Sequence, residues 1–307
     1  MLHAAVVLSA TLVVALIGLT PPTASAALTP HQEAINLAIE QGVAWLRGGQ
    51  IQYDASGVQY GYWDPGYGSD AYAAGTGMAL LALVSNWDAA SASDPDPVID
   101  DEHIRRALNW LLANQQGDGT WGGNQNYQVS AAIWGLAGLL PKLPPGSPSI
   151  GPTQTAIDAG AAWLVIAQWD EACLWGSVVP SNYQYYGGFG YGSSSRPDLS
   201  NSQFAIVALK AAHLNPAADS WAKAVQYIES CQYQNHSDGG MWYTPDSPVW
   251  GPGSTGSMTG AGVWSYRLCG VPVGDSRVQA ALQWLDDNYT YTQNAAGDPN
   301  CSHYYYL

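Results

Sequence analysis

The sequence predicts an all-α fold of about five helix pairs arranged in two concentric layers. Two observations lead to it. Aromatic-aliphatic pairs recur at Trp45-Leu46, Trp110-Leu111, Trp163-Leu164, Tyr227-Ile228 and Trp284-Leu285, with 65, 53, 64 and 57 residues between successive aromatics. Each pair is followed by a Gly-rich aromatic stretch and then by a segment of small and aliphatic residues. This period indicates a repeated helix pair and is too long for tetratricopeptide or ankyrin units.

The N-terminal residues predict export. Ala4 to Leu19 is an apolar stretch too short to span a bilayer, and Ala24-Ser25-Ala26 is typical of a signal-peptide cleavage site. We therefore expect a signal peptide at residues 1–26 and one mature domain at 27–307, secreted or periplasmic. Met1-Leu2-His3 carries no Lys or Arg, so an uncleaved anchor is the alternative.

The two helices of each unit differ in polarity. The first helix, as at 101–114, keeps a polar face that includes Arg105, Arg106 and Asn109. The second helices, predicted at 73–84, 129–140, 202–212 and 258–268, carry little polar surface. A helix that is apolar nearly all round must be buried, so the second helices form the inner layer and the first helices the outer layer. Asp100 or Asp101 is expected to cap one outer helix.

The net charge excludes one class of binding partner, and the cysteines indicate which covalent links the chain can form. The formal net charge of −15 repels phosphate backbones, so no nucleic acid partner is expected. Cys173, Cys231, Cys269 and Cys301 predict one or two disulfides in an exported chain. Buried free thiols are the alternative, because Cys231 and Cys269 lie in helical, apolar contexts.

One motif carries a resemblance to a known family. Arg106-Ala107-Leu108-Asn109-Trp110-Leu111 continues through Gln115 to Gly119-Thr120-Trp121, and a second copy runs to Gln232 and Gly240-Met241-Trp242. These segments resemble the QW repeat of the squalene cyclase and prenyltransferase α/α toroid family. Three segments, Gly187-Gly188-Phe189-Gly190-Tyr191-Gly192, Arg196 to Gln203 and Gly256-Ser257-Met258-Thr259, resemble uncharacterised exported bacterial proteins with this repeat more closely. We expect the repeat residues to hold the rim and not to catalyse; they are Gln50, Gln115, Trp121, Gln168, Gln232 and Trp242.

The resemblance implies a ring of about six helix pairs around a cavity that binds an isoprenoid. Cyclases of this family that start by protonation carry an Asp-x-Asp-Asp-Thr motif, whose middle Asp is the acid. The corresponding residues here are Asp198-Leu199-Ser200-Asn201-Ser202, so Ser200 stands at the acid position. A serine hydroxyl cannot protonate an alkene, so the cyclase reaction is not expected. Asp198, Ser200 and Asn201 are therefore either catalytic candidates or an N-cap box.

The sequence contains candidate residues for a zinc site and for a sugar-stacking groove. Asp298, Cys301 and His303 resemble the zinc ligands of protein prenyltransferases, but their compact spacing departs from that family's pattern, so a disulfide or surface loop is the alternative. No metal and no cofactor are expected. A sugar-stacking groove could involve Tyr183, Tyr185, Tyr186, Tyr191, Trp175 and Trp242, although core packing explains the same aromatics.

The sequence favours a ligand-binding or structural toroid and leaves open whether the protein is an enzyme. An isoprenoid-handling enzyme and a glycan-directed protein are the alternatives. The fifth unit ends at Leu307 before an inner helix is complete. We therefore expect an incomplete ring, truncated at the C-terminus, whose open edges associate with another copy.

Overall fold

The computed structural model describes residues 28–87, 99, 101–122, 125–172, 178–192, 195–233, 236–247, 253–290 and 294–295. Within these residues it contains nine α-helices, a two-stranded hairpin and two short 3-10 helices. The α-helices are α2 (Pro30–Gly48), α3 (Tyr72–Ser85), α4 (Glu102–Asn114), α5 (Gln125–Leu139), α6 (Ile150–Ala167), α7 (Leu199–Ala211), α8 (Asp219–Tyr233), α9 (Gly256–Leu268) and α10 (Ser276–Asp287). The strands are β1 (Ile51–Ala55) and β2 (Val58–Tyr62), and the 3-10 helices are η1 (Gly68–Ala71) and η3 (Leu140–Lys142).

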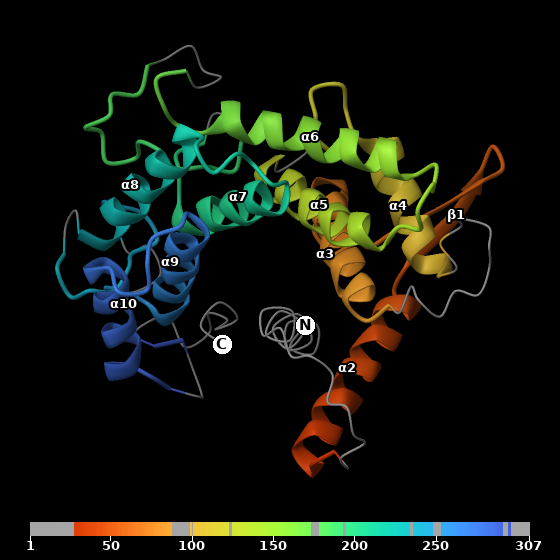
Figure 1. Cartoon of the computed structure of the whole chain (residues 1–307), viewed down its shortest axis with the longest axis horizontal. Coiled ribbons are helices and arrows are strands. Elements are labelled where there is room, and N and C mark those ends of the chain that lie inside the picture. The colour runs from red at the N-terminus through yellow and green to blue at the C-terminus, as the bar shows by residue number, and fades with distance from the viewer. Residues whose placement is uncertain are drawn as a thin grey trace.

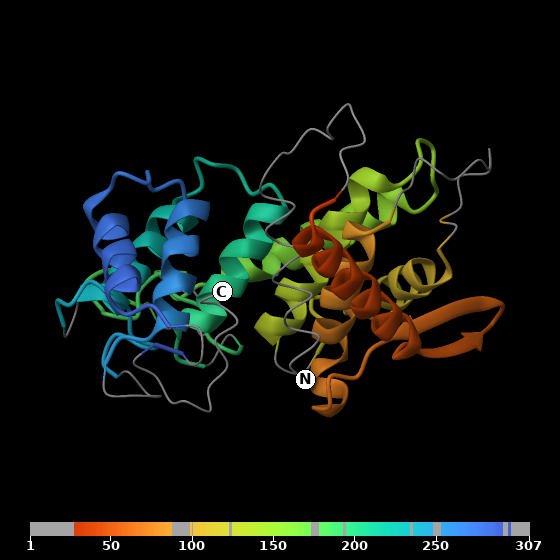
Figure 2. The same ribbon diagram turned by 90° about the horizontal axis from the view of Figure 1, so that it is seen from below.

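The helices form two layers along an open arc, with α2 at one end and α10 at the other (Figure 1). The inner helices α3, α5, α7 and α9 pack against one another in that order, and α4, α6, α8 and α10 lie outside them. Seen from below, α2 and the hairpin lie at one end of the molecule and α9 and α10 at the other (Figure 2). The described residues are mostly helical, which confirms the predicted fold class in this coarser form.

The polarity of each helix matches its layer. In α5, residues on nearly every side are buried, including polar Asn126 and Gln128, whereas α4 keeps a polar face against the hairpin and solvent. The inner helices α3 and α5 also approach each other at backbone distance. A Cβ added to Gly77 would collide with the Ala131 carbonyl, and one added to Gly135 would collide with Gly77 itself. Small residues at these positions therefore set the spacing of the inner layer.

Side-chain caps fix where several helices begin. The Asp101 carboxylate accepts hydrogen bonds from the backbone N–H groups of His103 and Ile104, which confirms that an aspartate caps this outer helix. Thr255 caps α9 and Asp275 caps α10 in the same way. Each cap satisfies donors that a helix N-terminus leaves unpaired.

The hairpin departs from the all-helical prediction. Its turn residues Ser56 and Gly57 have φ of 51° and 78°, which matches the right-handed twist of the two strands. Tyr53 pairs with Tyr60 across the strands, and the Arg106 guanidinium on α4 donates to the Asp54 carboxylate at 2.7 Å. The Gly-rich aromatic stretch of the first unit is thus a hairpin fastened to the next outer helix.

Several predictions concern residues outside the described part of the chain. These include the signal peptide at 1–26, the extent of the fifth unit after residue 295, and the residues Cys173, Trp175, Asp298, Cys301 and His303, so all of them stay predictions. Among the described residues no helix combines the length and the apolar character needed to span a bilayer.

Candidate functional site

The four repeat glutamines link successive outer helices. In each unit the Gln side-chain amide donates to a backbone carbonyl on the next outer helix, at 2.8 to 3.0 Å; the pairs are Gln50 with His103, Gln115 with Ala156, Gln168 with Ser220 and Gln232 with Arg277. The amides of Gln115, Gln168 and Gln232 also donate to a glycine carbonyl in their own connecting loop, at Gly119, Gly187 and Gly239. All four glutamines therefore bind backbone carbonyls of the next outer helix, and the side-chain oxygens of Gln50 and Gln232 also contact His103 and Tyr266.

In the first two units a buried tryptophan follows the glutamine and donates a hydrogen bond to the preceding outer helix. The indole N–H of Trp121 donates to the Leu111 carbonyl at 2.8 Å, and that of Trp63 donates to the Leu46 carbonyl at 2.7 Å. Trp63 closes the first unit in the same way as Trp121 closes the second, and sequence reasoning missed it. The hairpin separates Gln50 from Trp63 by more residues than in the second unit, so the spacing of the repeat motif does not reveal Trp63 in the sequence.

In the fourth unit the register differs by one residue from the predicted one. The glycine that accepts from the glutamine has φ of +89° at Gly119, +86° at Gly187 and +88° at Gly239. The residues two positions later are Trp121, Phe189 and Met241, and all three are buried. Met241 therefore takes the place expected for Trp242. The Trp242 ring instead stacks on His236, with ring centroids 4.5 Å apart.

The candidate residues Asp198, Ser200 and Asn201 lie at the N-terminus of the inner helix α7. The Asp198 carboxylate accepts from the Asn201 backbone N–H at 2.8 Å and from the Asn201 side-chain amide at 2.7 Å. It also accepts a hydrogen bond from Tyr243. Asp198 therefore caps α7, as in the N-cap alternative, and all three residues are buried.

Burial governs the protonation of Asp198. Desolvation raises the pKa of this carboxyl to about 6, although its hydrogen bonds from Asn201, Tyr243 and Ser200 each favour the charged form. Only 3% of the residue is exposed. Burial thus holds a carboxyl group with a pKa near neutral pH at the N-terminus of the inner helix α7.

Ser200 belongs to a group of hydroxyl-bearing side chains. Its hydroxyl lies 2.8 Å from the phenol oxygen of Tyr127, which comes from the N-terminal turn of α5. The Tyr127 ring meets the edges of Tyr191 and Phe204, at centroid distances of 5.5 and 5.0 Å. No motif marks Tyr127, although its place on an inner helix, seven residues before Trp134, puts both residues on one face of that helix.

Each inner helix leaves one partly exposed stripe, because neighbours cover its other sides. These residues recur at spacings of three, four or seven: Ala74, Met78 and Leu81 on α3; Tyr127, Trp134 and Gly138 on α5; Phe204 and Ala211 on α7; Gly260 and Trp264 on α9. The Trp134 and Trp264 rings lie 5.8 Å apart although α7 separates their helices. Because α6 and α8 pack on the outer side of α7, these rings meet on its concave side. The concave face is therefore apolar and rich in aromatic rings.

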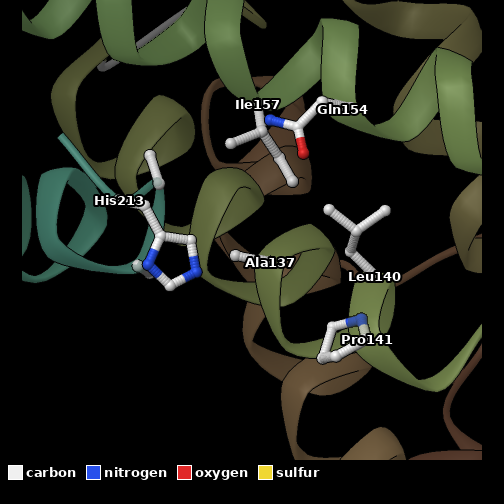
Figure 3. Close-up of a pocket in the computed structure, with 8 residues that line it drawn as sticks. Ala137, Leu140, Pro141, Gln154, Ile157 and His213 are labelled. Carbon is white, nitrogen blue, oxygen red and sulfur yellow. The ribbon is translucent and has the colours of Figure 1, made fainter.

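A small pocket opens at the opposite ends of the same helices. It holds about 190 Å³ and is lined by Ala137, Leu140, Pro141, Gln154, Ile157, Ala211, Ala212 and His213. Figure 3 shows the His213 ring on the side facing Leu140 across the pocket. From Ser200 to Ala211 the helix rises about 16 Å at 1.5 Å per residue, so the pocket and Asp198 cannot act on one atom. Its volume is also below the roughly 300 Å³ at which typical small-molecule sites begin.

The remaining candidate residues are the tyrosines of the predicted sugar groove, the cysteines and the possible metal ligands. Tyr185 and Tyr186 are buried, so the predicted sugar-stacking groove does not form from them, whereas Tyr183 and Tyr191 are about 40% exposed. Cys231 and Cys269 are free thiols, and burial raises the pKa of each. Within the described residues no three His, Cys, Asp or Glu side chains gather as a metal site would need.

These features define a class of protein: a mostly helical repeat fold whose units are linked by glutamines and whose concave face is aromatic. No protein-family model and no curated protein matches the sequence. Among solved structures the fold is similar to the type II terpene cyclase MstE from Scytonema, in complexes with the product merosterolic acid A and with the substrate geranylgeranyl dihydroxybenzoate. Both matches have a TM-score of 0.46, with 17% and 16% identity, and cover 94% of this chain and 69% and 68% of the cyclase chain. The similarity describes the arrangement of helices only.

Proposed function

We propose that this protein binds an apolar, isoprenoid-like small molecule along the concave face of its inner helices and does not protonate it as a cyclase would. The stripe of aromatic and aliphatic side chains on α3, α5, α7 and α9 carries the proposal. Trp134 and Trp264 meet across α7, and Phe204 contacts Tyr127 farther along the same face. Aromatic rings on a concave surface are the lining that small-molecule sites use.

The absence of cyclisation follows from the chemistry of the Asp198 region. An alkene is an extremely weak base, so its protonation needs a strong acid aimed at the double bond. Ser200 cannot supply one, and Asp198, with a pKa of about 6, is enclosed by the hydrogen bonds that cap α7. The residues at the start of α7 therefore suit ligand binding better than protonation of an alkene.

The binding proposal is tested with geranylgeraniol as the probe, followed by quenching of tryptophan fluorescence. Replacing Trp134 and Trp264 together by Ser should weaken binding at least ten-fold, because two rings of the stripe are lost. Trp45→Ala is the matched control, since Trp45 lies on α2 with 61% of its surface exposed. Equal affinity in the wild type and the double variant would rule out this face as the binding surface.

The second part of the proposal is tested by product analysis. After incubation with squalene, only starting material should be recovered. Any cyclised product would show that another residue supplies the acid, and the proposal would then give way to an enzyme of the isoprenoid class.

A further inference from the structure

The hairpin has one covered edge and one open edge. β2 lies against α4, where the Asn109 side-chain amide donates to the Gln59 backbone carbonyl at 2.9 Å. β1 lies on the other side of β2, and within the described part of the chain it packs mainly on β2. All five residues of β1 are exposed. Figure 1 and Figure 2 both show the hairpin projecting beyond the helices at this end of the arc.

The turn determines which backbone groups of β1 face the open edge. The two-residue turn at 56–57 makes Ala55 and Val58 a pair that exchanges backbone hydrogen bonds. Pairs of two kinds alternate along an antiparallel ladder, so Gln52 and Asp54 belong to pairs of the other kind. Their N–H and C=O groups point away from β2, and no hydrogen bond joins these groups to another described residue. Four backbone groups, two from each residue, are therefore available at the open edge.

The sequence of β1 does not protect this edge. Open edges are usually blocked by lysine, proline or a bulge, and the segment Ile51 to Ala55 contains none of these. Its one charged side chain, Asp54, already pairs with Arg106 on α4 at 2.7 Å. Ile51 and Tyr53, which share one face of the strand, are 43% and 42% exposed. The open edge can therefore accept another extended strand.

We propose that β1 pairs antiparallel with β1 of a second copy of this chain, so that two hairpins form one four-stranded sheet. The outward groups of Gln52 and Asp54 lie symmetrically about Tyr53, which places a two-fold axis at Tyr53. Gln52 then exchanges both backbone hydrogen bonds with Asp54 of the second copy, and the symmetric pair forms on the other side of the axis. All four groups are satisfied in each copy. The inference goes beyond the proposed function and does not rest on it.

Charge selects this register over its neighbours. With the axis at Tyr53, the side chain of Gln52 stands opposite Asp54 of the second copy. A shift that moves the axis to Asp54 would place two aspartates directly opposite each other, which is unfavourable. A shift of the axis to Gln52 would leave Asp54 beyond the paired strand, opposite Gln50 of the second copy.

The apolar face of β1 also fits the two-fold register. Tyr53 stands opposite Tyr53 of the second copy, in the kind of pair whose side chains lie closest. The Tyr53 and Tyr60 rings are already stacked within one hairpin, with centroids 5.2 Å apart. Two hairpins would therefore extend this pair to a row of four rings, and aromatic cross-strand pairs stabilise a sheet.

The dimer should be weak at low salt and stronger when salt is added. The paired strands are short, and each copy carries a formal net charge of −15, so the two copies repel each other. Added sodium chloride screens this repulsion and leaves the backbone hydrogen bonds in place. Sedimentation velocity over a range of protein and salt concentrations measures the dissociation constant.

Gln52→Pro should raise the dissociation constant of the dimer at least about ten-fold, because each copy loses one intermolecular hydrogen bond. The Gln52 N–H is not used within the hairpin, so proline should leave the hairpin folded. Gln52→Thr is the matched control, since threonine keeps the N–H and favours strands; it should dimerise as the wild type does. Thermal melts of both variants check that the fold is retained. Equal dimerisation of the two variants would overturn the proposal.

Cross-linking tests the register independently. In Tyr53→Cys, the two Cα atoms should lie about 4.5 Å apart, within reach of a disulfide. In Ala55→Cys, on the same face of the same strand, they should lie about 13 Å apart, which a disulfide cannot bridge. After mild oxidation, non-reducing electrophoresis should show a covalent dimer for Tyr53→Cys. The wild type and Ala55→Cys should stay monomeric on the same gel.

Three other results would contradict the proposal. These are a wild-type protein that stays monomeric at every accessible concentration, a dimer that added salt weakens, and equal cross-linking of Tyr53→Cys and Ala55→Cys. An assembly that survives Gln52→Pro would come from another surface and would also rule out β1 as the interface. Failure of ligand binding at the concave face would leave this inference unaffected.

Discussion

At the scale of single residues, burial determines what a polar group can do. Asp198 could be found from the sequence because it begins an inner helix within a motif. Its partner Tyr243 could not, since it comes from the segment between α8 and α9, far from Asp198 in the sequence. A local pattern therefore predicts a helix cap but not a partner from a distant segment.

Asp198→Asn should change how stability depends on pH. The folded-state pKa of about 6 lies above the ordinary 3.8, so the folded protein binds this proton more tightly than the unfolded chain. The unfolding free energy that this proton contributes is fully present below about pH 4 and is lost as pH rises to about 6, by about 3 kcal/mol at 1.36 kcal/mol per pKa unit. Relative to the variant, the wild type should therefore lose stability between pH 4 and 7.

Urea unfolding of both proteins at pH 4, 5, 6 and 7 measures this difference. Asparagine is also a good N-cap, so the start of α7 should be kept in the variant. A difference between the two proteins that stays constant with pH would mean that Asp198 titrates as an ordinary exposed aspartate.

Trp121→Ala should lower the free energy of unfolding by about 2 to 4 kcal/mol, because a buried ring and its hydrogen bond to the Leu111 carbonyl are removed. Trp45→Ala removes the same side chain from an exposed position and should change stability by less than about 1 kcal/mol. Chemical denaturation of the two variants provides the measurement. Similar losses in both would show that the buried position of Trp121 adds nothing to stability.

At the scale of elements, the repeat could be located from the sequence because its glutamines and aromatic residues recur with a regular spacing. The hairpin was missed although Ser56-Gly57 stands between two segments of alternating apolar residues, Ile51 to Ala55 and Val58 to Tyr62. The helical period dominated the interpretation of this segment. The register of the fourth unit was missed because Trp242 has the expected side chain, whereas backbone conformation at Gly239 assigns the position to Met241.

Gln168→Met should destabilise the protein by about 1 to 3 kcal/mol. It removes the donor that binds the Gly187 and Ser220 carbonyls in a fully buried place while keeping the length of the side chain. Gln154→Met on the exposed face of α6 is the control and should be close to neutral. Thermal melts of both variants would measure the effect, and an unchanged melting temperature for Gln168→Met would show that the bridge between α6 and α8 carries no stability.

At the scale of the whole molecule, the helix pairs follow an open arc whose first helix is poorly covered. Leu37 and Trp45 on α2 are 54% and 61% exposed, and within the described residues α2 packs mainly on α3. The layers and their order could be predicted from helix polarity. The close approach of α3 and α5 could not, because it depends on which glycines face each other, here Gly77 and Gly135.

Association of copies through the open edges of the arc stays a prediction, and the exposed face of α2 lies at one of these edges. Size-exclusion chromatography with light scattering should show dimers or larger species, because burying Leu37 and Trp45 removes apolar surface from water. The double replacement of Leu37 and Trp45 by Ser should shift the protein toward the monomer. A compact wild-type monomer at all accessible concentrations would contradict the prediction.

The glutamine bridges also bear on how such a chain can change through evolution. Each bridge contacts the next unit through a backbone carbonyl, a group that every amino acid provides, and only Gln50 also contacts a side chain there, the ring of His103. The hydrogen bond that links one helix pair to the next therefore depends little on the amino-acid sequence of the next pair. A gene segment encoding one helix pair could be duplicated or exchanged and still meet a compatible junction on both sides, so the number of units would be free to vary while the joining residue stayed the same.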